Sequence, residues 1–195
     1  MSIVRKVRRA GRKAGAAEAR IARASAPRAD GTSAKIVAAI GKLGDQPELR
    51  TLSFMVVAGG LIGANRRMIR AGIRMLLAHE LATLGKNLVK EQIDRTRPHS
   101  AKSRQEQAVK PGKHTAKTKT SFPSGHSAGS TAVARALSRE YPQLQPPALA
   151  AAAVVSTLQV PRLNHYPTDV AAGMVLGVLA EAAANLVFLG DDDER

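Results

Sequence analysis

An apolar run over residues 170–189 constrains the fold of this chain more than any other segment. Glu181 and Asn185 are the polar residues that interrupt it, and Pro167 lies just before it, where the first turn of a helix tolerates proline. A helix needs about 20 apolar residues to cross the hydrocarbon core of a bilayer. The run therefore predicts a long helix that is able to span a membrane.

Helical spacing of apolar residues, and the Gly- and Pro-containing breaks between them, divide the preceding sequence into further segments. These segments are residues 33–42, 49–64, 67–93, 124–140 and 147–158. Arg70 and Arg74 lie in the longest of them, and such residues are costly in lipid unless they face the interior of a bundle. We therefore expect an all-α protein, with a small up-down helical bundle over residues 33–190 that is embedded in a membrane.

Charge is distributed unevenly along the chain, which has a formal net charge of +15. Residues 1–32 form a basic arm, either flexible or a surface helix, residues 99–121 form a basic loop, and residues 191–195 form an acidic tail. Such a charge points to anionic membrane lipids, phosphorylated substrates or nucleic acid as partners. We expect the arm to contact an anionic membrane surface, with an organelle transit peptide as the alternative.

The composition argues against several other classes of site. The chain has no cysteine, so it has no disulfides, no thiol chemistry and no Cys/His cluster of the kind that binds zinc. It has no Trp, two Tyr and three Phe, which are too few rings for base-stacking platforms and argue against nucleic acid as a partner. We expect neither a metal nor another cofactor.

Three short groups of residues have the chemistry of a phosphate site. Lys90 and Arg97 are cations two helical turns apart. Ser124 and Gly125 lie at a predicted helix start, where backbone N–H groups bind anions, and His126 is placed there to transfer a proton. Each group alone is also typical of an ordinary helix end, but the combination is not.

His165 and Asp169 form the third group and share a helix face, because they are four residues apart. A carboxylate near one imidazole nitrogen fixes the tautomer and leaves the other nitrogen free to attack. The spacing alone allows either His126 or His165 to be the nucleophile. All three groups lie at helix ends that meet at the same end of an up-down bundle, so one site can assemble there.

The order Lys-x6-Arg-Pro, Pro-Ser-Gly-His and His-x3-Asp resembles the type 2 phosphatidic acid phosphatases, which are grouped with vanadium haloperoxidases and bacterial acid phosphatases. The resemblance spans roughly residues 45–187, with the motifs between 90 and 169. It implies a membrane-embedded helical bundle and a metal-independent phosphatase. The expected substrate is a phosphate monoester or diphosphate, most simply one carried by a lipid.

The resemblance also implies a role for each residue of the motifs. His165 would attack phosphorus to form a phosphohistidine, and Asp169 would orient His165. His126 would protonate the leaving oxygen and then activate water. The phosphate would be bound by a set of cations and helix-start groups, namely Lys90, Arg97, Ser124, Gly125 and Arg162.

The third motif departs from the family pattern, which has Ser-Arg with the arginine six residues before the histidine. Leu158 and Gln159 occupy those two positions here. The nearest arginine is Arg162, and we expect it to substitute for the missing cation.

Two alternatives explain parts of the sequence. A non-catalytic basic protein that binds anionic membrane or nucleic acid would explain the charge but not the three motifs. A vanadate-dependent haloperoxidase would explain the motifs, because vanadate mimics phosphate, but nothing in the sequence indicates an oxidant or halide pocket. A lipid phosphatase explains both the charge and the motifs, and we expect it in a membrane, specifically a bacterial inner membrane.

Overall fold

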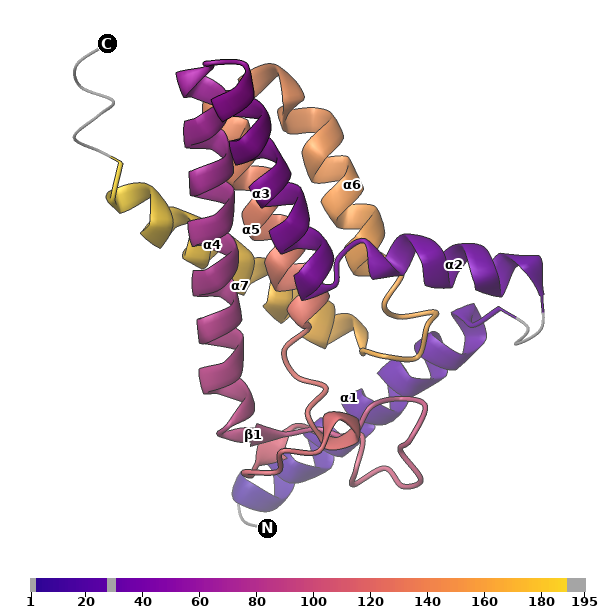
Figure 1. Ribbon diagram of the computed structural model, residues 1–195. Helices are drawn as coiled ribbons and strands as arrows, with labels where there is room; N and C mark the ends of the chain where they lie inside the picture. Colours follow the sequence, from indigo (N-terminus) through magenta and orange to yellow (C-terminus); the bar gives the residue numbers. More distant parts are fainter. Residues whose placement is uncertain (1–2, 28–30, 189–195) are drawn as a thin grey trace.

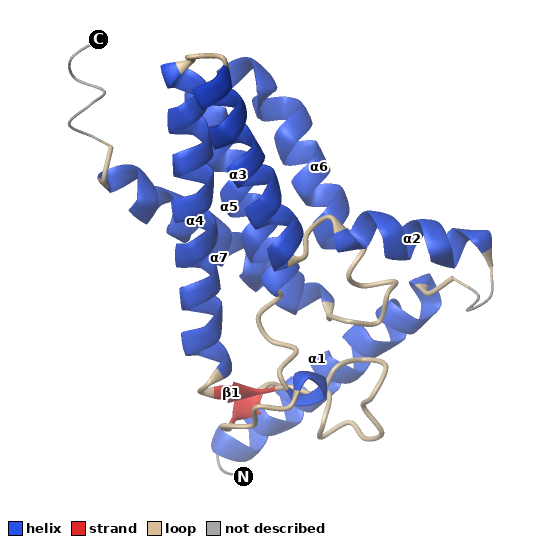
Figure 2. Ribbon diagram, in the orientation of Figure 1, coloured by secondary structure: helices blue, strands red, loops and turns tan. Residues whose placement is uncertain are grey.

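The computed structural model describes residues 3–27 and 31–188, and the acidic tail expected at residues 191–195 lies outside them (Figure 1). The described chain is almost entirely helical (Figure 2), which confirms the all-α prediction. Its helices are α1 (Ile3–Ser25), α2 (Thr32–Lys42), α3 (Gln46–Ile62), α4 (Arg66–Lys90), α5 (Gly125–Glu140), α6 (Gln145–Thr157) and α7 (Pro167–Leu186). The remaining elements are the strands β1 (Ile93–Asp94) and β2 (Lys110–Pro111) and the 3-10 turns η1 (Lys117–Lys119) and η2 (Pro142–Leu144).

Helices α3 to α7 form an up-down bundle, in which α4, α5 and α7 pack against one another. The predicted bundle began at residue 33, but α2 lies across its side next to α6. Helix α3 packs on α4, and α6 packs on α5. Small side chains dominate the buried core, which lets the helices approach closely. The buried core residues of the three central helices are Met75, Ala78, Ala82, Ala128, Ala132, Val133, Ala136, Ala180 and Ala184.

Gly173 and Gly177 let α7 contact α5 backbone to backbone. A Cβ atom at Gly173 would overlap the Ser124 carbonyl oxygen, and one at Gly177 would overlap the Ala128 carbonyl oxygen. Small residues four apart on one helix face allow such an approach. The Ser124 N–H also donates to the Asp169 carbonyl oxygen at 2.9 Å, so the starts of α5 and α7 are fixed against each other.

Helix α7 is the one helix, within the described residues, that is long and apolar enough to cross a membrane. Its outer face is apolar, with Val175, Leu179 and Leu186 all exposed. On α3, Ile62 is 89% exposed. An apolar surface of this extent on several helices is typical of a protein that contacts lipid or another protein.

Buried ion pairs join the helices at the end of the bundle where α4 begins and α5 ends. The Glu140 carboxylate accepts from Arg70 and from Arg74, both at 2.9 Å. The Glu181 carboxylate, which interrupts the apolar run, accepts from two arginines of α5 at 2.9 Å and 2.8 Å. The Glu140 and Glu181 carboxylates therefore face the interior of the bundle, and arginines of α4 and α5 pair with them.

The opposite end of the bundle is covered by α1 and by the loops between α4 and α5 (Figure 1). Helix α4 ends at Lys90, earlier than the predicted end at residue 93, because residues 93–94 pair with residues 110–111 as β1 and β2. Ala19 and Ala22 of α1 are buried. The sequence motifs converge at this end.

Candidate active site

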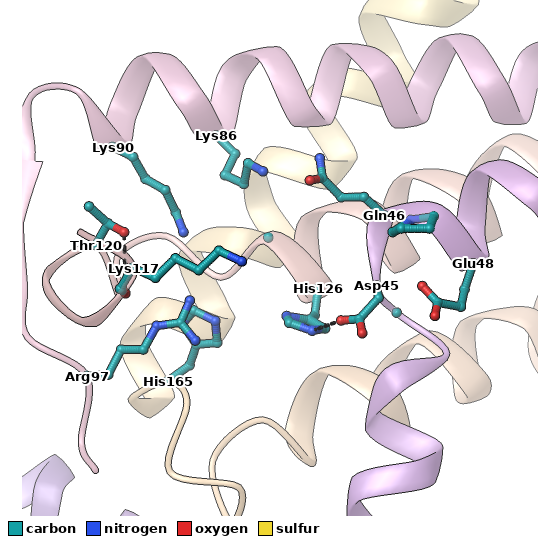
Figure 3. Close-up of a pocket in the computed structure, with 13 residues that line it drawn as sticks. Asp45, Gln46, Glu48, Lys86, Lys90, Arg97, Lys117, Thr120, His126 and His165 are labelled. Atoms are coloured by element: carbon teal, nitrogen blue, oxygen red, sulfur yellow. Dashed lines mark hydrogen bonds and ion pairs between the residues drawn. The ribbon is translucent and has the colours of Figure 1, made fainter. Parts of the chain in front are cut away.

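A cavity of about 510 Å³ lies at this end between α3, α4, α5 and the loop before α7 (Figure 3). Its cationic lining residues are Lys86, Lys90, Arg97 and Lys117. In the part of the chain that the structure describes, none of these four cations forms an ion pair with a carboxylate. Unpaired cations around a cavity create a positive potential that favours an anionic ligand.

Arg97 shows this need for an anion most clearly. Its Nε is buried and has no hydrogen-bond partner among the described residues. Burial lowers the pKa of Arg97, the Asp169 carboxylate opposes this shift, and the charge of Arg162 lowers the pKa further. A phosphate oxygen in the cavity would supply both a hydrogen-bond acceptor and a compensating charge.

The start of α5 contributes Gly125 and His126 to the cavity but not the Ser124 hydroxyl. Ser124 is fully buried and caps α5, because its Oγ accepts from the Ser127 N–H at 3.3 Å and from the Ser127 hydroxyl at 2.9 Å. The absence of a side chain at Gly125 leaves room for Lys86, whose Cδ would lie 2.7 Å from a Cβ there. Ser124, which was predicted to bind phosphate, therefore lies behind the cavity lining.

Two imidazole rings, of His126 and His165, lie close together in the cavity. The ring centroids of His126 and His165 are 6.0 Å apart, and the ring planes are inclined by 65°. The His126 Nε2 contacts the carboxylate of Asp45, the residue that precedes α3 (Figure 3). Burial lowers the pKa of His126, the Asp45 carboxylate opposes this shift, and the charges of Arg162 and Arg97 lower the pKa further. The arrangement suits one imidazole as nucleophile and the other as proton donor, with the reacting group between them.

His165 is 1% exposed, and its burial determines its protonation. Burial lowers the pKa of His165 to about 4, the Asp169 carboxylate opposes the shift, and Arg97 and Lys90 lower the pKa further. The imidazole is therefore neutral at pH 7 and has a nitrogen lone pair available for attack. Its Nδ1 lies 3.7 Å from Asp169 Oδ2, which is within ion-pair range but longer than a hydrogen bond.

Asp169 is fixed mainly by residues other than His165. Its carboxylate accepts from Arg95 Nη1 at 2.5 Å, from the Tyr166 N–H at 3.0 Å and from the Ser121 hydroxyl. Arg95 is 1% exposed, stacks 3.8 Å above the Tyr166 ring and pairs with Glu18 of α1 at 2.5 Å. A buried carboxylate with these donors is held in one position.

Arg162 is not brought into the cavity. Its Nη1 donates to the Gln159 side-chain oxygen at 3.3 Å, and its guanidinium lies against Gly41 of α2. Gln159 is itself anchored, because its side-chain amide donates to the Gly41 carbonyl oxygen at 3.2 Å. Leu163 turns the backbone with a φ of 55° just after Arg162. Arg162 therefore does not line the cavity, although its charge is close enough to lower the pKa of Arg97.

Comparison with known proteins assigns the chain to a family. The PAP2 superfamily matches residues 71–190, more than half of the chain. The chain belongs to the PAP2 superfamily. Among solved structures, it is similar to the crystal structure of the first transmembrane PAP2-type phosphatidylglycerolphosphate phosphatase from Bacillus subtilis, with 25% identity and a TM-score of 0.66. That match covers 92% of this chain and 86% of the other. Curated protein sequences give no match.

This PAP2 site contains residues that sequence reasoning missed. Lys86 lies one turn before Lys90 on the same face of α4, so helical spacing could have revealed it. Arg95 lies inside the first motif, but nothing in its position predicts a contact with Asp169. Asp45 is distant in sequence from every motif, and no pattern marks it. No group of three or more His, Asp or Glu residues that could hold a metal occurs within the described ranges.

Proposed function

We propose that this PAP2 protein is a membrane-embedded phosphatase that removes a phosphate from a lipid monoester or diphosphate through a phosphohistidine at His165. The observation that carries the proposal is the pair of imidazoles 6.0 Å apart in one cavity lined by four cations. A phosphoryl group placed in the cavity beside the two rings would be within reach of both. The cations would stabilise the charge that develops on its oxygens.

The proposed reaction has two steps. In the first, a nitrogen of His165 attacks phosphorus, the bond to the leaving oxygen breaks, and His126 gives that oxygen a proton. In the second, His126 takes a proton from a water molecule, the water oxygen attacks phosphorus, and the bond between phosphorus and His165 breaks. Free phosphate and the neutral His165 are the products of this step.

Each surrounding residue has a defined task in this scheme. Lys90, Arg97 and the Gly125 N–H bind the phosphoryl oxygens, and the charge of Arg162 adds to the potential. Asp169 stabilises the positive charge that His165 acquires on attack. Burial lowers the pKa of His126, and Asp45 opposes that shift, so Asp45 supports the protonated form that the first step needs.

A lipid is the substrate class that the surroundings favour. The exposed apolar faces of α3 and α7 are suited to a bilayer, and the cavity opens at one end of those helices. The similar structure from Bacillus subtilis is a transmembrane phosphatase of a phosphorylated lipid. A bacterial inner membrane is the location that we predict.

The test is phosphate release by the detergent-purified protein from a panel of lipid phosphates, with a chelator present. We expect release by the wild type and none by the His126→Ala and His165→Ala variants, which should retain the helical circular dichroism of the wild type. Turnover by the His165→Ala variant at the wild-type rate would contradict the proposed nucleophile. No release from any substrate by folded protein would favour a non-catalytic protein that binds anionic membrane.

A further inference from the structure

A second cationic groove lies outside the catalytic cavity, between α1 and the loop at residues 102–107. Its volume is about 470 Å³. Its cationic lining residues are Lys13, Arg20, Arg23, Lys102 and Arg104. None of the described residues that line this α1 groove is acidic.

The two walls of the α1 groove carry charge of the same sign. Arg20 of α1 and Arg104 of the loop line it together, although like charges repel across a contact. Helix α1 nevertheless lies close against the loop, because a Cβ at Gly15 would be only 2.7 Å from the Gln107 carbonyl oxygen. An anion in the groove would remove the repulsion that opposes this contact.

The α1 groove lies level with the start of the candidate membrane span. The Glu18 carboxylate of α1 accepts from the Thr168 N–H at 2.8 Å, and Thr168 is in the first turn of α7. Ile21 of α1, which follows the groove residue Arg20 in sequence, is 56% exposed. A helix with cations and exposed apolar residues at the end of a spanning helix is placed among lipid head groups.

A short chain of contacts joins the α1 groove to the catalytic site. Gln107 lines the groove, and its carbonyl oxygen accepts from Arg95 Nε at 2.9 Å. Arg95 also pairs with Glu18 at 2.5 Å and with Asp169 at 2.5 Å. Both walls of the groove therefore contact the guanidinium that fixes the Asp169 carboxylate.

We propose that the α1 groove binds the phosphate head groups of anionic membrane lipids, and that this binding fixes Asp169 through Glu18 and Arg95. Glu18 and Arg95 are positioning residues, because they act on His165 only through Asp169. The catalytic half of the proposal rests on the proposed phosphatase function, whereas the binding half does not.

The experiment compares the full chain in nanodiscs of phosphatidylcholine alone and of phosphatidylcholine with about 30 mol% phosphatidylserine, an anionic lipid without a phosphate monoester. Hydrogen exchange reports on α1 and on residues 165–170 without any turnover. Phosphatidylserine should slow hydrogen exchange in both segments. At a fixed mole fraction of the lipid phosphate that serves as substrate, it should also raise kcat about fivefold or more.

The matched variants separate the α1 groove from general surface charge. Arg20→Ala with Arg104→Ala removes two groove cations and should abolish both effects of phosphatidylserine. Arg12→Ala with Lys110→Ala removes two exposed cations outside the groove and should preserve both effects. Glu18→Gln should keep the lipid effect on α1 but lose the rise in kcat, with KM unchanged.

Each outcome decides a part of the proposal. Unchanged exchange in α1, or equal losses in the two double variants, would overturn the lipid site. Slower exchange in α1 without a rise in kcat would overturn the coupling to Asp169. Slower exchange in both segments, with no phosphate release from any lipid in either membrane, would support the lipid site and contradict the proposed phosphatase.

Discussion

Cations are paired with a carboxylate at one end of the bundle, whereas the Lys and Arg side chains that line the cavity at the other end have no such partner among the described residues. Where α4 begins, Arg70 and Arg74 are both paired with Glu140. Where α4 ends, Lys90 and Arg97 line a cavity and have no carboxylate partner among the described residues. A charge removed from water is costly unless it is paired, so the first end is complete in itself, and the half-buried cations of the second end favour an external anion. The charges at the start of α4 therefore stabilise the fold, whereas those at its other end are available to a ligand.

The largest effect is expected at the paired end. Glu140→Leu removes the carboxylate that pairs with Arg70 and Arg74 and should lower the free energy of unfolding by about 3–5 kcal/mol. Glu80→Leu is the matched control, because it breaks the half-exposed pair with Arg50 and should change the free energy of unfolding far less. Denaturant titration in detergent measures both. Similar losses in the two variants would contradict the structural role of the Glu140 cluster.

The unpaired end should respond in activity rather than stability. Arg97→Met removes a ligand of the proposed phosphate and should lower kcat/KM by a factor of about 100–1000. The thermal midpoint should be unchanged or higher, because the substitution removes a half-buried charge that has no carboxylate partner among the described residues. Lys110→Met, at an exposed position in β2, is the control for charge and should leave kcat/KM unchanged. A large fall in stability with Arg97→Met would contradict the comparison.

The protonation of His165 sharpens the comparison further. Its pKa of about 4 keeps the imidazole neutral at pH 7, and activity should fall about tenfold per pH unit below that value as protonation removes the nucleophile. Histidine NMR titration, assigned with His165→Ala, measures the pKa directly. Arg97→Met should raise the pKa of His165, because the charge of Arg97 lowers that pKa. A midpoint near the ordinary value of 6.5 would contradict the burial of His165.

The same shift predicts how stability depends on pH. The pKa of His165 is lower in the folded than in the unfolded chain, so the unfolded chain binds more protons between about pH 6.5 and pH 4. His165 therefore destabilises the fold as pH falls through that window. The fall in the free energy of unfolding with decreasing pH should be smaller in the His165→Ala variant. An identical pH dependence of that free energy in both proteins would contradict the lowered pKa of His165.

The smallest effect is expected at the edge of the catalytic cavity. Lys86 is partly exposed, so Lys86→Met should weaken substrate binding by a factor of about two to five, mainly in KM. High salt should reduce the difference between variant and wild type, because salt screens exposed charges. A loss as large as that of Arg97→Met would place Lys86 among the principal phosphate ligands.

The sequence predicted the helices and the convergence of the motifs because both follow from local rules. Apolar spacing and proline breaks gave helix ranges within a few residues of α4, α5 and α7. Helix ends then placed Lys90, His126 and His165 at one end of the bundle. The functional roles of these residues stay predictions.

The parts that could not be predicted depend on contacts between distant segments. Asp45 meets His126 only because α3 packs beside α5. Arg162 was expected near the phosphate, but the turn at Leu163 and the anchoring of Gln159 on α2 direct it elsewhere. No spacing rule contains such information, since it arises from tertiary packing.

The glycine contact between α5 and α7 has a consequence for biosynthesis. His165 and Asp169 are translated after the first two motifs, and they take their places only when Gly173 and Gly177 have seated α7 against α5. A nascent chain that already carries Lys90 and His126 therefore has no complete cavity. His165 and Asp169 are therefore synthesised together with the helix that closes the bundle, so the cavity is complete only when assembly is finished.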